Sequence, residues 1–241
     1  MSDGEVRPRQ PAGKVVRETV LLLVFAVLLA LVVKTFLVQS FYIPSESMEP
    51  GLQVNDRILV QKPSYWFGGE PQRGDVVVFD DPGDWLAVDE PEPSGVAALL
   101  AKIGLYPTGG HLVKRVIGVG GDTIECCDEE GRLSVNGTAL DEDSFIDPQT
   151  DCDGPMKFDC SWTAGPVPDG MLFVMGDNRD DSADSTVHLC REKNPGCDPE
   201  AAYVPVDLVV GKVFALVWPP GRADLTGRPD VFDSVADPAS D

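Results

Sequence analysis

Residues 111–119 read HLVKRVIGV and carry the strongest strand signal in the chain. Side chains alternate across a strand, so Leu112, Lys114 and Val116 share one face. A lysine in a strand is usually a surface charge, but the rest of this face is apolar. If burial removes water from the ammonium group, its pKa falls and the free amine can accept a proton. The stretch therefore indicates a core strand and a candidate general base.

Similar strand-like runs lie on both sides of this stretch and are separated by turn signals. With 24 Gly and 21 Pro among 241 residues, the composition favours a strand-rich fold over a helical bundle. The pattern predicts a mostly β domain. The expected elements are strands at 54–62, 76–79, 171–175 and 208–218, a hairpin at 132–139, and a short helix at 96–103.

The charge of the chain is strongly acidic and unevenly distributed. The formal net charge is −21, yet the first 17 residues carry four basic and two acidic side chains. The remainder carries 15 basic and 38 acidic side chains. Nucleic-acid binding needs a basic surface, so we expect no nucleic-acid partner.

An apolar run of 14 residues, 20–33, follows the basic segment. As a helix it would be about 21 Å long, short of a ~30 Å hydrocarbon core, and continuing it to residue 38 supplies the missing length. Basic residues before the run predict a cytoplasmic N-terminus and an exported body. Two interpretations are open, a retained anchor and a signal peptide cut after Ser40.

Six cysteines, all in the body, fit disulfide bonds in an oxidising compartment. No CxxC pattern is present, so a zinc site is not expected. We expect local bridges Cys152–Cys160 and Cys190–Cys197, whereas adjacent Cys126 and Cys127 could pair only with strain.

The segment FYIPSESMEPGL, 41–52, follows the apolar run and places Ser45 and Ser47 two residues apart. A serine becomes nucleophilic when a base takes its proton. The two histidines, His111 and His188, offer a Ser-His-Asp arrangement if one reaches the serine. The lysine of HLVKRVIGV is the other candidate base.

Residues 176–185, GDNRDDSADS, contain four aspartates, two serines and an arginine after a predicted strand. The spacing lacks the glycine and terminal glutamate of an EF-hand loop, so calcium is not expected. We interpret the segment as hydroxyl and carboxylate groups that hold and orient a buried amine.

Taken in order, these segments resemble bacterial type I signal peptidase, the membrane-anchored Ser/Lys endopeptidase of protein export. FYIPSESMEPGL resembles its nucleophile box, whose usual form is PSxSMxPTL. Four later segments resemble the family's other sequence motifs. They are RGDVVVF at 73–79, HLVKRVIGVGGD at 111–122, GDNRDDSADS at 176–185 and VVGKVFALVWP at 209–219. Any one box is weak, and five in series are highly specific.

The resemblance implies a mostly β, two-lobed antiparallel fold and roles for the matching positions. Ser47 is the implied nucleophile and Lys114 its general base. Ser45, with the Ser47 backbone N–H, would form the oxyanion hole. Ser182 would hydrogen-bond and orient Lys114, and Asp184 would support that loop. The implied pockets for Ala-x-Ala-like residues before the cut are lined by Ile43, Pro44, Met48, Leu52, Leu112 and Val113.

The implied organisation begins with a cytoplasmic tail, 1–18, and a transmembrane anchor, 19–38. An extracytoplasmic peptidase domain, 39–220, would carry insertions at 80–110 and 123–170 and precede a flexible tail, 221–241. The enzyme would be a single-pass protein of the cell membrane that cleaves signal peptides from exported preproteins. No metal or cofactor is implied, and the resemblance favours the retained anchor.

Several positions depart from the family pattern, although none removes an implied catalytic atom. Thr186 stands where an arginine is usual, which removes the expected salt bridge to Asp184. Asp181 replaces a usual asparagine, Gly51 a threonine and Gly120 a proline. Two alternatives stay open: an inactive relative that binds exported chains, and a peptidase of the same type that processes a single substrate.

Overall fold

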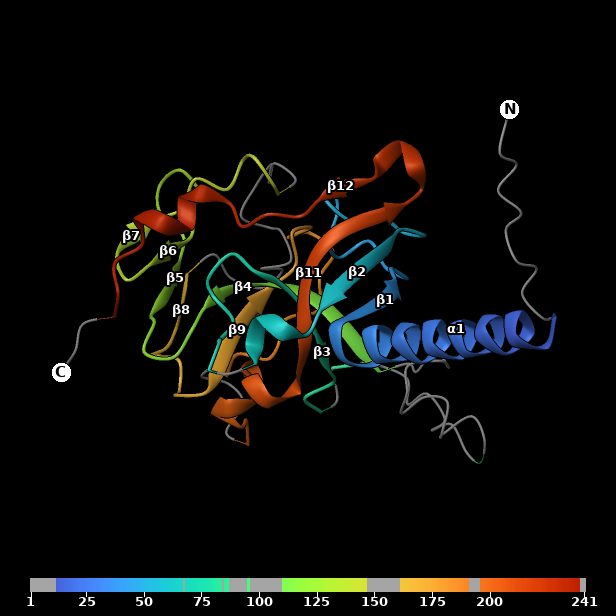
Figure 1. Ribbon diagram of the computed structural model, residues 1–241. Coiled ribbons are helices and arrows are strands. Elements are labelled where there is room, and N and C mark those ends of the chain that lie inside the picture. The colour runs from blue at the N-terminus through green and yellow to red at the C-terminus, as the bar shows by residue number, and fades with distance from the viewer. Residues whose placement is uncertain are drawn as a thin grey trace.

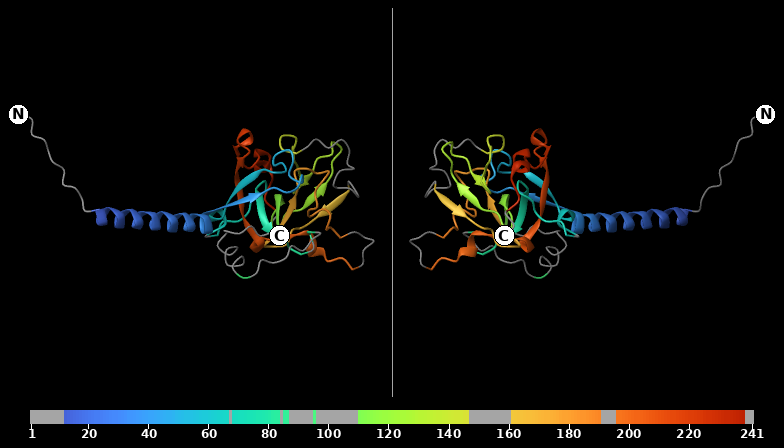
Figure 2. Two further views of the ribbon diagram at one scale, coloured as in Figure 1. Left: turned by 90° about the vertical axis from the view of Figure 1, so that its right-hand side faces the viewer. Right: turned by 90° about the vertical axis from the view of Figure 1, so that its left-hand side faces the viewer.

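The computed structural model describes residues 12–66, 68–83, 85, 86, 95, 110–146, 161–190 and 196–238. Helix α1 (Ala12–Val32) projects from a β body, and a π-helical turn, Val33–Leu37, joins it to the first strand (Figure 1, Figure 2). Within α1, Gly13–Val32 has a mean hydropathy of 2.5 and no buried residue. Its length and composition suit a membrane span, and a signal sequence has the same properties.

An antiparallel sheet forms the larger lobe, in the order β1-β2-β11-β3-β4-β9-β10, with β12 paired to β11. One of its faces packs Ile58, Val60 and Val78 in a shared apolar cluster. The strands are β1 (Val38–Tyr42), β2 (Arg57–Gln61), β3 (Val76–Asp80), β4 (His111–Gly118), β9 (Met171–Met175), β10 (Val204–Pro205), β11 (Val209–Trp218) and β12 (Asp224–Leu225).

The predicted mostly β fold is confirmed, and the strands expected at 54–62, 76–79, 111–119, 171–175 and 208–218 are present. Strand β1 was not expected, because its residues read as the continuation of the apolar run. It pairs with β2 in register from Val38 opposite Gln61 to Tyr42 opposite Arg57. The helix therefore passes almost directly into the sheet, and the two serines follow at the end of its edge strand.

A smaller antiparallel sheet, in the order β7-β6-β5-β8, forms the second lobe. Its strands are β5 (Ile124–Cys126), β6 (Ser134–Val135), β7 (Thr138–Ala139) and β8 (Trp162–Ala164). The predicted hairpin joins β6 to β7, and Asn136 and Gly137 have φ values of +52° and +75°. A two-residue type I′ turn requires positive φ at both positions. Ile124 of this lobe and Phe173 of β9 share one buried cluster, which joins the lobes.

The C-terminal segment packs on the body, unlike the flexible tail expected at 221–241. Phe232 and Val235 are only 2% and 7% exposed, and both lie in the cluster that joins the lobes. Asn136 Nδ2 donates to the carbonyl oxygen of Ala236 at 2.9 Å. The many prolines and aspartates predicted a loose tail, but two apolar side chains suffice to hold the segment against the core.

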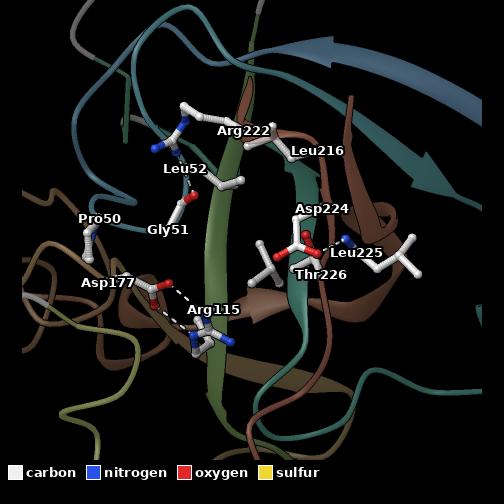
Figure 3. Close-up of a pocket in the computed structure, with 11 residues that line it drawn as sticks. Pro50, Gly51, Leu52, Arg115, Asp177, Leu216, Arg222, Asp224, Leu225 and Thr226 are labelled. Carbon is white, nitrogen blue, oxygen red and sulfur yellow. Dashed lines mark hydrogen bonds and ion pairs between the residues drawn. The ribbon is translucent and has the colours of Figure 1, made fainter. Parts of the chain in front are cut away.

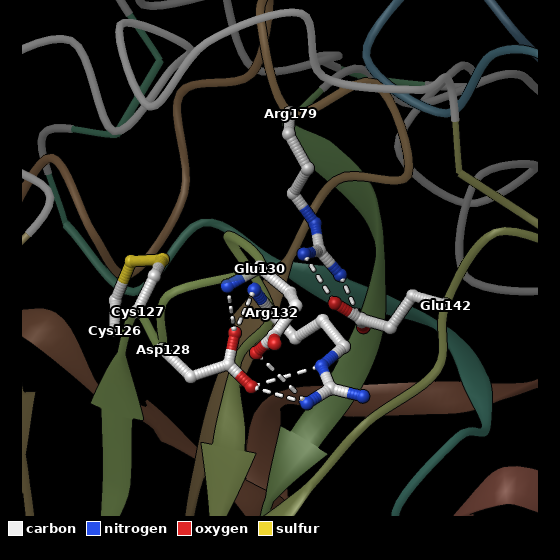
Figure 4. Close-up of a disulfide and its surroundings, with 7 residues drawn as sticks. All are labelled: Cys126, Cys127, Asp128, Glu130, Arg132, Glu142 and Arg179. Carbon is white, nitrogen blue, oxygen red and sulfur yellow. Dashed lines mark hydrogen bonds and ion pairs between the residues drawn. A yellow bond between two sulfur atoms is a disulfide. The ribbon is translucent and has the colours of Figure 1, made fainter.

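Two disulfides are present among the described residues. The predicted Cys190–Cys197 bridge is confirmed, with Cα atoms 5.6 Å apart. Adjacent Cys126 and Cys127 form the other (Figure 4). The predicted Cys152–Cys160 bridge and the helix at 96–103 lie outside the described residues.

Candidate active site

Ser47 lies in a tight turn between β1 and β2. Backbone hydrogen bonds close the turn, from Glu49 N to Glu46 O at 3.0 Å and from Leu52 N to Met48 O at 2.8 Å. Ser47 is 8% exposed, so its hydroxyl sits in a largely dry setting. The turn therefore holds the candidate nucleophile in a defined position.

Lys114, in the middle of β4, reaches this serine. Its Nζ lies 2.7 Å from Ser47 Oγ, although the two residues are 67 positions apart. Lys114 is 4% exposed, and its strand neighbours Leu112 and Val116 are buried on the same apolar face. The two candidate catalytic residues thus meet in the contact that proton transfer requires.

The electrostatic setting of Lys114 favours a free amine. Burial lowers the pKa of Lys114 to about 8, because the ammonium form loses water that the protein does not replace. The negative charges of nearby carboxylates, Asp184 first, oppose this shift. A substantial fraction of the amine is therefore neutral at mildly alkaline pH.

Ser45 lies on the same side of the chain as the candidate nucleophile. Its Oγ is 3.3 Å from Ser47 Oγ. Ser45 is exposed, so its hydroxyl can turn toward a group bound above Ser47. This is the location that a donor to a developing oxyanion needs.

Asp184 is fully buried and accepts four hydrogen bonds, two at each carboxylate oxygen. Thr186 N and Oγ1 donate to Oδ1 at 3.0 and 2.7 Å. Gly176 N and Ser182 Oγ donate to Oδ2 at 2.9 and 2.6 Å. Thr186 therefore supplies neutral hydrogen-bond donors where the family pattern has an arginine. These hydrogen bonds hold the 182–186 loop in place without that salt bridge.

Ser182 differs from its implied role of hydrogen-bonding Lys114. Among the hydrogen bonds of the described residues, its hydroxyl donates to Asp184 and makes none with Lys114. The hydroxyl gives its one proton to the Asp184 carboxylate, which is a strong acceptor. The loop acts on Lys114 through the charge of Asp184.

Gly176 is a site residue to which the sequence analysis assigned no role. A Cβ built on it would collide with the carbonyl oxygen of Ser47 and the side chain of Ser182. Only glycine lets the nucleophile's turn and the 182–186 loop approach from both sides. The signal in the sequence was a glycine directly after a buried strand.

Two buried arginine pairs flank this glycine, and their partners were also missed. Arg115 Nε and Nη2 donate to Asp177 at 2.7 and 2.6 Å. Arg179 Nη1 and Nη2 donate to Glu142 of the second lobe at 2.8 and 2.6 Å. The sequence shows all four charged residues but not how they pair.

The implied pocket residues separate into two groups. One apolar cluster contains or contacts Ile43, Met48, Leu52 and Val113. Leu112 lies in a different cluster, on the strand face that it shares with Lys114, because neighbouring strand residues point to opposite sides. Pro44 is exposed.

A pocket of about 340 Å³ borders the same turn on the Arg115 side (Figure 3). Of the implied lining residues only Leu52 reaches it, and neither Ser47 nor Lys114 does. A Cβ on Gly51 would make only ordinary contacts, with Met48 O at 3.7 Å and Asp177 Oδ2 at 3.8 Å. A Cβ would therefore fit at this position without strain.

The two histidines contact side chains other than that of Ser47. His111 Nδ1 lies 2.7 Å from Asp80 Oδ1, and the His188 ring stacks on Trp85 with centroids 4.6 Å apart. The described residues contain no group of three His, Cys, Asp or Glu arranged to hold a metal ion. Lysine is thus the base that the geometry offers to Ser47.

Comparisons with known proteins agree on one family. The family model described as "Signal peptidase, peptidase S26" matches residues 16–218. A signal peptidase I of Mycobacterium tuberculosis is 43% identical over 233 residues, covering 89% of this chain and 76% of the relative. A probable signal peptidase I of Mycobacterium leprae is 41% identical, covering 85% of this chain and 77% of the relative. A solved signal peptidase I from Enterococcus faecalis is 23% identical, covers 59% of this chain and 96% of that chain, and has a TM-score of 0.32, too low to support an argument.

Proposed function

The chain belongs to the peptidase S26 family of signal peptidases, and from that premise we propose that Ser47 and Lys114 form its catalytic dyad. The observation that carries the proposal is the 2.7 Å contact between Lys114 Nζ and Ser47 Oγ. Its support is chemical, since burial lowers the lysine pKa to about 8 and so produces a base. The proposed reaction is hydrolysis of a signal peptide from an exported preprotein.

In the acylation step the neutral Lys114 amine accepts the hydroxyl proton while Ser47 Oγ attacks the carbonyl carbon of the scissile bond. The negative charge that develops on the carbonyl oxygen receives hydrogen bonds from the Ser45 hydroxyl and the Ser47 N–H. When the bond breaks, the Lys114 ammonium gives its proton to the leaving amine. The signal peptide is then held as an ester on Ser47.

In the second step the neutral amine takes a proton from water, and the hydroxide attacks the ester carbonyl. The tetrahedral species collapses, Ser47 Oγ regains its proton from Lys114, and the signal peptide leaves as a carboxylic acid that releases its proton to water. Asp184 keeps its loop in place throughout, because all four of its hydrogen bonds come from groups that do not react.

Substrate choice is proposed to rest on small apolar pockets that accept Ala-x-Ala-like residues before the cut. The support is that Ile43, Met48 and Leu52 are apolar and belong to one buried cluster beside the Ser47 turn. The direct test is cleavage of a preprotein peptide with such a site, compared with a peptide carrying a bulky residue just before the cut. Equal cleavage of both would contradict the proposal.

We also propose that α1 is a retained anchor with a cytoplasmic N-terminus. The apolar run at 20–33, within a helix long enough to cross a membrane, and the basic residues before the run support this orientation. Mass spectrometry of the membrane-extracted protein should find residues 1–40 intact. A mature chain that begins after Ser40 would contradict a retained anchor.

Activity should rise with pH through about 8, because only the neutral amine of Lys114 can accept the Ser47 proton. The pKa is lowered, so the base is lost as pH falls, and kcat/KM should drop about tenfold per pH unit well below that value. The measurement is a profile of kcat/KM between about pH 5 and pH 10. An optimum on the acidic side would contradict a lysine base.

A further inference from the structure

Residues 142–146 of the smaller lobe contact the loops that hold the nucleophile. Glu142 accepts hydrogen bonds from Arg179 Nη1 and Nη2 at 2.8 and 2.6 Å. Both side chains are buried, with Arg179 1% and Glu142 5% exposed. Figure 4 shows the two groups facing each other from separate segments of the chain. The pair joins the smaller lobe to the loop after β9.

Arg179 links this ion pair to the candidate active site. Its Nε donates to the carbonyl oxygen of Gly176 at 2.9 Å, and Gly176 packs against Ser47 and Ser182. Without the charge of Glu142, the guanidinium would be buried with its main partner gone, which is strongly unfavourable. Arg179 would then turn toward another acceptor or admit water. Gly176 would lose the hydrogen bond to its carbonyl oxygen and keep only the one from its N–H to Asp184.

The same segment also reaches the other buried arginine. The guanidinium carbon of Arg115 lies 4.5 Å from the centre of the Phe145 ring, within the range of a cation–π contact. Arg115 in turn binds Asp177 through two hydrogen bonds. Ile146 forms a β-bridge with Pro50, which lies in the nucleophile's turn. The segment 142–146 therefore contacts both the Arg115 side chain and the turn that holds Ser47.

Resting on the proposed function, we propose that Glu142 is a positioning residue for the cleavage reaction, acting through Arg179 on the Gly176 carbonyl and hence on Ser47. The smaller lobe supplies no reacting atom, but its Glu142 keeps the nucleophile's turn in register with Lys114. A misplacement of about 1 Å can cost roughly 100-fold in rate. None of the implied substrate-lining residues belongs to 142–146, so we expect the larger effect on kcat and the smaller one on KM.

The test is Glu142→Gln in the full-length protein in detergent micelles. With a preprotein peptide as substrate, kcat should fall about 10- to 100-fold and KM should stay within about twofold. Glu125→Gln is the matched control, since Glu125 is an exposed glutamate on β5 of the same lobe. It should leave both constants unchanged. Circular dichroism gives the folded fraction, against which each kcat is normalised.

A double-variant cycle tests whether Glu142 affects kcat through Arg179. If Glu142 acts through Arg179, adding Glu142→Gln to Arg179→Met should cause no further loss of kcat beyond about twofold. Full additivity of the two losses would mean that Glu142 acts independently of Arg179, and the proposal would fail.

Arg179→Met alone is the second probe if Glu142→Gln does not fold. It removes the hydrogen bond to the Gly176 carbonyl oxygen, and it should lower kcat by about as much as Glu142→Gln with KM within about twofold. A normal kcat in whichever of these variants folds would overturn the proposal, as would a loss that only tracks the folded fraction. If the wild type and Glu125→Gln cleave the peptide, the proposed function stands whatever Glu142→Gln does. If the wild type cleaves no such peptide, it is the proposed function that fails.

Discussion

Replacing Lys114 by methionine should reduce preprotein cleavage by about 1,000-fold or more. Methionine has a similar length and suits the buried apolar face, so the fold should be retained while the amine is lost. Ser47 Oγ would then have no proton acceptor at 2.7 Å. Single-turnover cleavage of a preprotein peptide at about pH 9, where the amine is mostly neutral, gives the largest difference.

Ser47→Ala should cause a loss of the same order, and the double variant should be no slower than either single variant. Residues that act as one unit show this non-additivity. Lys62→Met is a matched control, because Lys62 is a partly buried lysine just after β2 that belongs to no part of the proposed site. Cleavage within tenfold of the wild-type rate by either single variant would contradict the dyad.

Gly176→Ala should lower kcat by about 100-fold while the protein stays folded. The added methyl group would meet the Ser47 carbonyl oxygen on one side and the Ser182 side chain on the other. Both groups would have to move, which separates the nucleophile from Lys114 and disturbs the Asp184 loop. Overpacking of this kind costs about 1–3 kcal/mol of stability, so a lower melting temperature should accompany the loss.

Gly227→Ala provides the control for the same chemical change. Gly227 is exposed, and a Cβ there would have no neighbour within 4 Å. Its kcat and melting temperature should equal those of the wild type. A Gly176→Ala enzyme with full kcat would show that the close approach at this glycine is unimportant for catalysis.

The sequence predicted the strands well where apolar residues alternate or form buried runs. HLVKRVIGV, VVVF and MLFVM became β4, β3 and β9, since each is a short, mostly apolar run that is largely buried in the sheet. It failed at β1, whose residues continue an apolar helix without a break, and at the C-terminal segment. There the burial of Phe232 depends on a surface made by distant residues, including Gly74.

Within the site, the local sequence pattern predicted that Lys114 lies on an apolar strand face and that Ser45 lies beside Ser47. Both are properties of short stretches, and the structure agrees with them. Local pattern could not show that the Ser182 hydroxyl gives its proton to Asp184. Which side chain this hydroxyl reaches depends on how the fold places the 182–186 loop.

From the sequence alone came the mostly β fold, the apolar helix, and a serine and a lysine suited to one reaction. Each follows from periodicity or residue type over about ten positions. The tertiary structure decided which distant groups meet: Lys114 with Ser47, Gly176 between two loops, and Glu142 with Arg179. Strand register and the packing of the two lobes determine such contacts. A partner that lies 37 or 67 residues away in the sequence does not affect the local residue pattern, so the pattern cannot predict it.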